Sequence, residues 1–148
     1  MRRAGVTLLE MLVVVAIIGA IVGISMPALT AGLAGVRLSS ASGSVASFLT
    51  GSMNRVERRE QAAAIVVDPV KNTIAVFTAA SGDKPADSLA MPTGVVIEGQ
   101  EARRFLLYPG GTFPRMEIVL RSEKGARRAV SIDPITVVPS IRRVEEAR

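Results

Sequence analysis

Glu10 is a single carboxylate at the start of a long apolar run, with the basic pair Arg2 and Arg3 before it and no further charge until Arg37. Placing an ionised side chain in the hydrocarbon of a membrane costs about 2.5–3.5 kcal/mol even on the mildest insertion scale. A buried Glu10 therefore requires a positively charged partner. The alternative is a glutamate that stays at an interface and is reached by water. The chemistry that this spacing suggests is an ion pair in apolar surroundings.

Composition excludes most enzymatic chemistry. The chain of 148 residues contains no cysteine and no histidine, so it lacks thiolate nucleophiles, imidazole bases, disulfides and the usual ligands of zinc. The spacing of Asp68, Asp83 and Asp87 matches no EF-hand loop, and neighbouring prolines favour turns. Gly110 and Gly111 lack the Lys and Ser or Thr of a phosphate-binding loop. We therefore predict that the chain is not an enzyme and that it binds no metal or cofactor.

The apolar run is long enough to span a membrane. Every residue from Met11 to Ile24 is apolar or glycine, and counting from Val6 gives the ~20 residues that a helix needs to cross the hydrocarbon core. The preceding basic pair predicts a cytoplasmic N-terminus, with the rest of the chain outside. The alternative is a secretory signal peptide cleaved somewhere in residues 28–35. Glu10 and the absence of a clean Ala-x-Ala cleavage site argue against that alternative.

The features of the N-terminal segment are the leader Arg2-Arg3-Ala4-Gly5, the block Val6-Thr7-Leu8-Leu9-Glu10 and an apolar stretch interrupted by Pro27. Together they resemble the type III signal of type IV pilins and type II secretion pseudopilins. The resemblance implies that a prepilin peptidase cleaves between Gly5 and Val6 and methylates the new N-terminus. It also implies that Glu10 pairs with the N-terminal amine of a neighbouring subunit and so guides assembly. Val6 departs from the phenylalanine that is usual at this position, which bears on methylation more than on cleavage.

The sequence predicts one helix from about Thr7 to about Arg59. Pro27 lacks an amide hydrogen and clashes with the preceding turn, so we expect a helix kink there. After Pro27, apolar residues recur at steps of three and four, which is typical of an amphipathic helix that packs on a domain. The predicted buried face consists of Leu38, Ala41, Val45, Phe48, Leu49, Ser52 and Val56.

From residue 63 onward, short runs rich in valine and isoleucine alternate with turn residues, which predicts β-strands. We expect a polar loop from Ser81 to about Pro92, and an edge strand at Thr136–Ile141 in which Pro139 limits the ladder hydrogen bonds. Packing of the helix on one antiparallel sheet of these strands gives an α+β fold. The other predicted strands are Ala63–Val67, Thr73–Thr78, Val95–Glu98, Arg104–Tyr108, Met116–Arg121 and Arg128–Ile132.

Later segments add a second resemblance, carried by Arg55–Asp68, Phe105, Tyr108–Gly111, Ile118-x-Leu120 and the strand after Gly125. They look like the domain of the H-class minor pseudopilins (GspH/FimT-like) of the type IV pilin superfamily. The implied organisation is a leader at residues 1–5, a transmembrane or filament-core half of the helix at 6–30, an amphipathic half at 31–60 and a periplasmic β-rich domain at 61–148.

The first hypothesis is therefore a minor pseudopilin, a structural subunit of the type II secretion pseudopilus that helps drive protein export across the outer membrane. The resemblance implies three partners: other major and minor pseudopilins, a prepilin peptidase that processes the chain, and the bacterial inner membrane, which the chain crosses once. The alternative is a minor type IV pilin involved in pilus assembly or DNA uptake. A third hypothesis is a secreted soluble domain that follows an ordinary signal peptide.

Four arginines near the C-terminus are candidates for contacts with nucleic acid or with a protein partner: Arg127, Arg128, Arg142 and Arg143. Contacts between arginine and phosphate give an affinity that depends on salt and not on base sequence. Few aromatic residues are available nearby to stack on bases. A solvated strand face, or ion pairs with acidic residues of neighbouring subunits, is therefore favoured over DNA binding.

Overall fold

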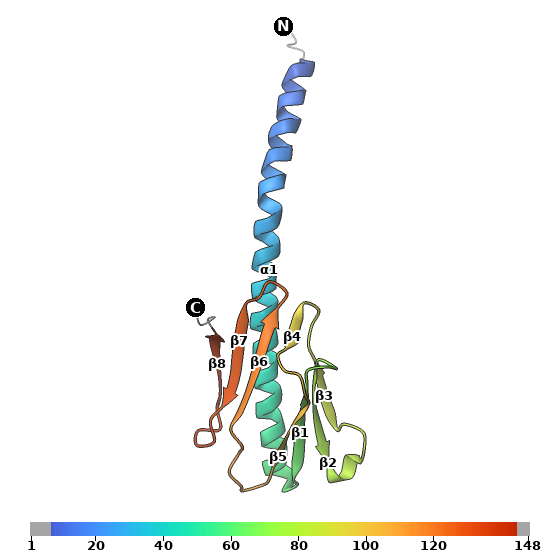
Figure 1. Cartoon of the computed structure of the whole chain (residues 1–148), viewed down its shortest axis with the longest axis vertical. Coiled ribbons are helices and arrows are strands. Elements are labelled where there is room, and N and C mark those ends of the chain that lie inside the picture. Colours follow the sequence, from blue (N-terminus) through green and yellow to red (C-terminus); the bar gives the residue numbers. More distant parts are fainter. Residues whose placement is uncertain (1–6, 145–148) are drawn as a thin grey trace, which may run out of the picture. The chain divides into compact units, whose positions relative to one another are not determined.

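The computed structural model describes residues 7–144, except for the side chains of residues 24–31. In these residues the chain forms a long helix, α1 (Leu8–Arg59), a short 3-10 helix, η1 (Ala79–Ser81), and eight strands (Figure 1). The chain divides into two compact units, here called the N-terminal unit (residues 1–33) and the C-terminal unit (residues 34–148). The strands are β1 (Ala63–Asp68), β2 (Thr73–Thr78), β3 (Asp87–Ala90), β4 (Val95–Ile97), β5 (Arg103–Leu107), β6 (Met116–Ser122), β7 (Arg127–Ile132) and β8 (Pro139–Val144).

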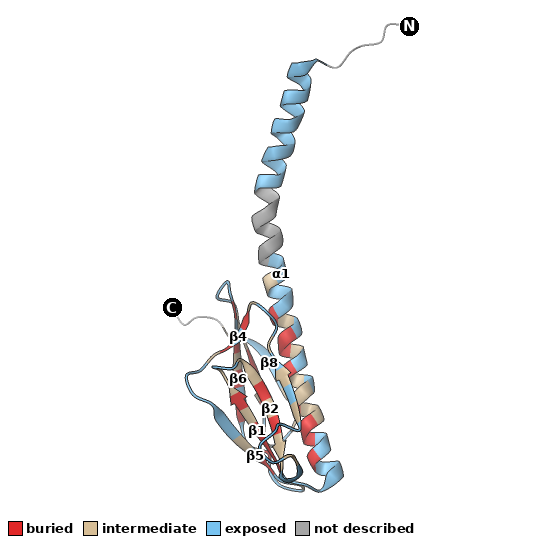
Figure 2. Ribbon diagram, turned by 90° about the vertical axis from the view of Figure 1, so that its right-hand side faces the viewer, coloured by how far each residue is buried: buried red, intermediate tan, exposed pale blue. Residues whose placement is uncertain are grey.

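In the N-terminal unit, α1 begins at a threonine cap. The backbone amide of Glu10 donates a hydrogen bond to Thr7 Oγ1 at 3.3 Å, and the amides of Glu10 and Met11 donate to the Thr7 carbonyl at 3.1 and 3.2 Å. These bonds satisfy amides that would otherwise lack a partner in the first turn. All side chains from Thr7 to Gly23 are exposed (Figure 2). Among the described residues, no helix combines the length and the apolar character that are needed to cross a membrane.

In the C-terminal unit, α1 buries one face against the strands. Leu38 and Leu49 are almost fully buried there, which confirms the face predicted from the spacing, although Phe48 is only half-buried. The structure adds Ser42 and Met53 to this face. The Ser42 hydroxyl donates to the Leu38 carbonyl at 2.7 Å, so its burial leaves no unpaired polar group.

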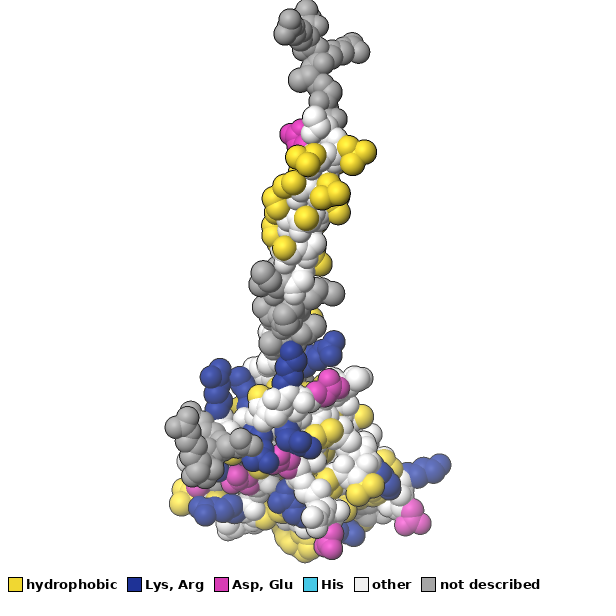
Figure 3. Space-filling view, turned by 45° about the horizontal axis from the view of Figure 1, so that its top comes forward, with side chains coloured by type: hydrophobic (Ala, Val, Ile, Leu, Met, Phe, Trp, Pro, Cys, Tyr) yellow, Lys and Arg dark blue, Asp and Glu magenta, His cyan; other side chains and the backbone are white. Residues whose placement is uncertain are grey.

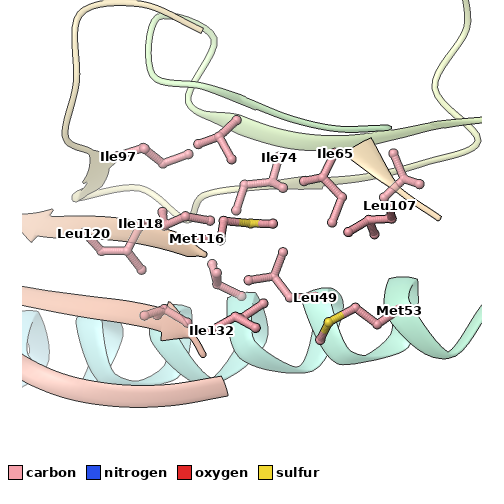
Figure 4. Close-up of a cluster of buried hydrophobic side chains, with 14 of the residues drawn as sticks. Leu49, Met53, Ile65, Ile74, Ile97, Leu107, Met116, Ile118, Leu120 and Ile132 are labelled. Atoms are coloured by element: carbon pink, nitrogen blue, oxygen red, sulfur yellow. The ribbon is translucent and has the colours of Figure 1, made fainter. Parts of the chain in front are cut away.

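The strands form two four-stranded antiparallel sheets, with the orders β3-β2-β1-β5 and β4-β6-β7-β8. Alternation along β6 buries Met116, Ile118 and Leu120 and exposes or half-exposes the residues between them, as expected for a strand with one face in the core. The core contains apolar side chains from α1 and from both sheets (Figure 4). The predicted α+β fold is confirmed. The single predicted sheet is wrong, because β5 pairs with β1 while β4 pairs with β6.

Two other stretches differ from the sequence prediction. The polar loop predicted from Ser81 to Pro92 contains β3, a short strand that pairs with the edge of β2. The strand predicted at Thr136–Ile141 begins only at Pro139, because the preceding residues form a turn in which the Asp133 carbonyl accepts a hydrogen bond from the Val137 amide at 2.9 Å. β8 is an edge strand, as predicted, and this position accommodates a proline.

Asn72 joins the two sheets. It lies in the turn between β1 and β2, where Asn72 Nδ2 donates to the Val95 carbonyl at 2.8 Å and Asn72 Oδ1 accepts from the Ile97 amide at 2.9 Å. Its φ of 55° is in the left-handed region, which asparagine tolerates better than most residues. Near the end of α1, Glu57 accepts a hydrogen bond from the Gly110 amide at 3.2 Å. These contacts position the sheets, which carry the C-terminal arginines, relative to the helix segment of the same unit.

Candidate functional site

Glu10 lies in the first turn of α1 and its side chain is exposed. The positive end of the helix dipole favours a carboxylate there by about 0.3–1 kcal/mol at an exposed site. Residues three and four positions apart share a helix face, so the side chains that follow Glu10 on its face are Val13 and Val14, both exposed. The carboxylate therefore borders an apolar surface. Gly5 and Val6 lie outside the described residues, so the cleavage site and the new amine remain predictions.

No lysine or arginine lies between Glu10 and Arg37. A cationic partner of Glu10 therefore has to come from outside this stretch of α1. The nearest source along the chain is the segment that precedes Thr7, and a neighbouring molecule is the other source.

Gly19 and Gly23 lie one helical turn apart in the apolar part of α1. A Cβ added at either position would meet no atom within 4 Å, so no described contact within the chain requires glycine there. Each glycine nevertheless costs about 1 kcal/mol relative to alanine in a helix interior. Pro27 lies within α1, but its side chain is outside the described residues, so the kink stays a prediction.

Arg127 and Arg142 lie on one face of the sheet β4-β6-β7-β8, and each has a carboxylate partner. Arg127 Nε lies 2.7 Å from Glu98 Oε1, and Arg142 Nη2 lies 2.9 Å from Glu117 Oε1. Such partly exposed pairs contribute at most about 1 kcal/mol to stability. They do, however, offset the positive charge that a phosphate backbone would contact.

Arg128 and Arg143 lie on the opposite face, because neighbouring residues of a strand alternate between faces. They stand directly opposite each other across β7 and β8. The structure thus brings the four arginines together as two pairs on two faces and not as one patch. Sequence reasoning missed this division, because three of the four arginines lie outside the strands that it predicted, one beginning at Arg128 and the other ending at Ile141. It also missed Glu98 and Glu117, whose pairing depends on register between strands.

The N-terminal sequence matches the model of a known family, the prokaryotic N-terminal methylation motif, over residues 1–26. The fold is similar to the solved structure of the minor pseudopilin EpsH from the Type 2 Secretion System of Vibrio cholerae. The TM-score is 0.56 at 11% sequence identity, and the match covers 76% of this chain and 99% of that chain. No curated protein matches the chain significantly.

The motif and the architecture together define a class: the protein has a type IV pilin-like fold with a prepilin-type N-terminus. Within that class, the structure that it resembles is a minor pseudopilin. The prepilin-type N-terminal motif seen in the sequence is therefore confirmed, and the fold is similar to that of a minor pseudopilin. The matched motif includes Gly5, Val6 and Glu10, the residues for which the resemblance implies roles in processing and assembly.

Proposed function

We propose that this protein is a minor pseudopilin, a structural subunit of a type II secretion pseudopilus. Residues 6–30 anchor it in the bacterial inner membrane, its β-rich domain lies in the periplasm, and it acts by packing and polymerisation and not by catalysis. The observation that supports this most directly is Glu10, an exposed carboxylate in the first turn of a helix whose side chains up to Gly23 are exposed and almost all apolar. Such a surface is stable when lipid or other helices cover it.

Processing would supply the cation that Glu10 lacks. Cleavage between Gly5 and Val6 by the prepilin peptidase creates an α-amine at Val6, and methylation leaves that amine positively charged. In the proposed filament, the amine of one subunit pairs with Glu10 of its neighbour, so that both charges enter apolar surroundings as a pair. The match of the methylation motif to residues 1–26 supports this step.

The same pair would set the register between subunits. A neighbour displaced along the helix leaves Glu10 against apolar side chains such as Val13 and Val14, and an unpaired buried charge costs about 3–5 kcal/mol. Apolar packing alone discriminates weakly between such positions, because the residues are similar all along the segment. Gly19 and Gly23 would allow neighbouring helix backbones to approach closely once the register is set.

The likeness of the fold to EpsH, which is a minor pseudopilin of a type 2 secretion system, supports the assignment to type II secretion. On this proposal the partners are other major and minor pseudopilins. The alternative, a minor type IV pilin that takes up DNA through its C-terminal arginines, has less support. Arg127 and Arg142 already face carboxylates, so two of the four arginines are partly neutralised.

The substitution Glu10→Gln tests the proposal in cells that carry the complete secretion system. Mass spectrometry should show a mature chain that begins at Val6, because the cleavage site is intact. Co-purification with other pseudopilins should fall more than about 100-fold, since a buried ammonium without its partner costs about 3–5 kcal/mol.

The matched control is Glu101→Gln, which removes an exposed carboxylate from the C-terminal unit and should change neither processing nor co-purification. Normal co-purification and normal secretion by the Glu10→Gln variant would contradict the proposed pairing. A mature chain that begins at Met1, or beyond Ala28, would contradict the processing.

A further inference from the structure

A basic surface lies at the end of the C-terminal unit where α1 enters it. The strands β6 and β8 end at this place and β7 begins there (Figure 1), and lysine and arginine side chains gather around it (Figure 3). We call this surface the basic end. It consists of Arg37 on α1, Lys124 in the β6–β7 turn, Arg128 at the start of β7 and Arg143 near the end of β8.

Three cations of the basic end make no ion pair within residues 7–144, although the exposed carboxylate of Glu123 lies in the same turn as Lys124. These three cations are Arg37, Arg128 and Arg143, in contrast to Arg127 and Arg142 on the other face. Arg128 and Arg143 are also directly opposed across β7 and β8. Like charges at opposed positions repel each other and weaken a sheet. An anion from outside the described chain would relieve this repulsion.

The position of the basic end in the chain indicates what kind of anion this is. The C-terminal unit begins at Ala34, and Arg37 lies within one helical turn of it. The residues between Glu10 and Arg37 carry no charge. If this uncharged segment enters a bilayer, the lipid headgroups lie where the segment joins the C-terminal unit. A bilayer surface can contact separate cations at once and needs no cleft.

We propose that the basic end docks on the anionic phospholipid headgroups of the membrane that holds the N-terminal unit. The inference rests on the proposed function, because only a membrane-anchored chain keeps the basic end at a bilayer. Docking holds the C-terminal unit on the membrane before assembly, and entry into a filament releases it. The contact is short-ranged, because salt screens the attraction over about 10 Å at 0.1 M ionic strength.

The expected strength follows from the number of cations. Each lysine or arginine near an anionic surface favours the docked state about five-fold. Neutralising Arg37, Arg128 and Arg143 together should therefore lower the ratio of docked to undocked protein roughly 100-fold at low salt. Neutralising three cations at the opposite end of the unit should have little effect, since that end lies beyond the screening length.

Energy transfer from a labelled protein to labelled lipid headgroups can measure this docking. The chain contains no cysteine, so one introduced cysteine carries one fluorophore. Ala126→Cys places the label in the β6–β7 turn at the basic end, and Ala80→Cys places a control label on η1, after β2; both positions are exposed. The full-length protein is reconstituted in vesicles of phosphatidylcholine, alone or mixed with phosphatidylglycerol, and flotation reports anchoring.

The protein should float with both kinds of vesicle. Transfer from the label at residue 126 should be high only with phosphatidylglycerol, and it should be lost at high salt and in the triple variant R37Q, R128Q and R143Q. Transfer from the label at residue 80 should stay low. The matched control is the triple variant R58Q, R59Q and K84Q, which removes the same net charge at the other end of the unit and should keep the high transfer.

The outcomes separate the docking from the proposed function. If the protein floats with the vesicles but energy transfer from residue 126 is the same with and without phosphatidylglycerol and at low and high salt, the docking is overturned and the membrane anchor stands. Failure to float with either kind of vesicle overturns the anchor, and the docking with it. Retention of duplex DNA that depends on the same three arginines, without any effect of phosphatidylglycerol, overturns the proposal in favour of a nucleic-acid surface. The salt titration of the unmodified arginines tests the docking even if the triple variant does not fold.

Discussion

Removing the Asn72 side chain should destabilise the C-terminal unit, because this side chain connects the two sheets. Its two hydrogen bonds, to the Val95 carbonyl at 2.8 Å and from the Ile97 amide at 2.9 Å, contribute about 0.5–1.5 kcal/mol each. Asn72→Gly should therefore lower the free energy of unfolding by about 1–3 kcal/mol. Asn72→Ala should lower it by about 1 kcal/mol more than Asn72→Gly, since alanine is strained at a φ of 55° and glycine is not.

Urea denaturation of the full chain in detergent, followed by circular dichroism, measures these differences. Amide hydrogen exchange gives a local measure, because the Ile97 amide loses its acceptor and should exchange about ten-fold faster or more for each 1.4 kcal/mol lost. Asn54→Ala, at an exposed position of α1, is the control and should change stability by less than about 0.5 kcal/mol. A stability of Asn72→Gly equal to that of the unmodified chain, with Ile97 still protected, would refute the idea that Asn72 joins the sheets.

Two further substitutions test the core and the surface with the same denaturation assay. Leu49→Ala removes a fully buried side chain and should lower the free energy of unfolding by about 2.7–5 kcal/mol. Leu106→Ala, at a position that is 51% exposed, should lower it by less than about 1 kcal/mol. Equal effects of the two substitutions would contradict the assignment of the core. Asp87→Asn breaks the ion pair between Arg55 and Asp87, whose side chains are both 44% exposed, and should cost no more than about 1 kcal/mol. A loss above 2 kcal/mol would mean that this pair holds β3 to the helix.

The parts of the fold that the sequence predicted are those set by local patterns. Steps of three and four residues predicted the buried face that contains Leu38 and Leu49, and alternation predicted the buried side of β6. The segment of β3 has no such pattern, because its pairing depends on the free edge of β2. The turn before β8 was readable in principle, since Asp133 is followed by a proline and its side chain accepts a hydrogen bond from the Ile135 amide at 2.8 Å.

The candidate site was predictable to a different extent in the two units. The need of Glu10 for a counter-charge follows from the sequence alone, because no other charge occurs between Glu10 and Arg37. The partners of the C-terminal arginines did not follow, because Glu98 and Glu117 are brought to Arg127 and Arg142 by the pairing of strands that are distant in sequence. When strand pairing brings two charged residues together, their spacing along the chain does not predict that they form an ion pair.

Charge balance would also make assembly depend on processing. If an unprocessed subunit entered the proposed filament, Arg2 and Arg3 would approach the same apolar surroundings as the neighbour's Glu10, and one carboxylate can neutralise only one of them. Each remaining charge would cost about 2.5–3.5 kcal/mol in hydrocarbon. Removal of residues 1–5 leaves one amine at Val6 for one carboxylate at Glu10. Electrostatics alone would then exclude uncleaved subunits, without any protein that recognises the leader in the filament.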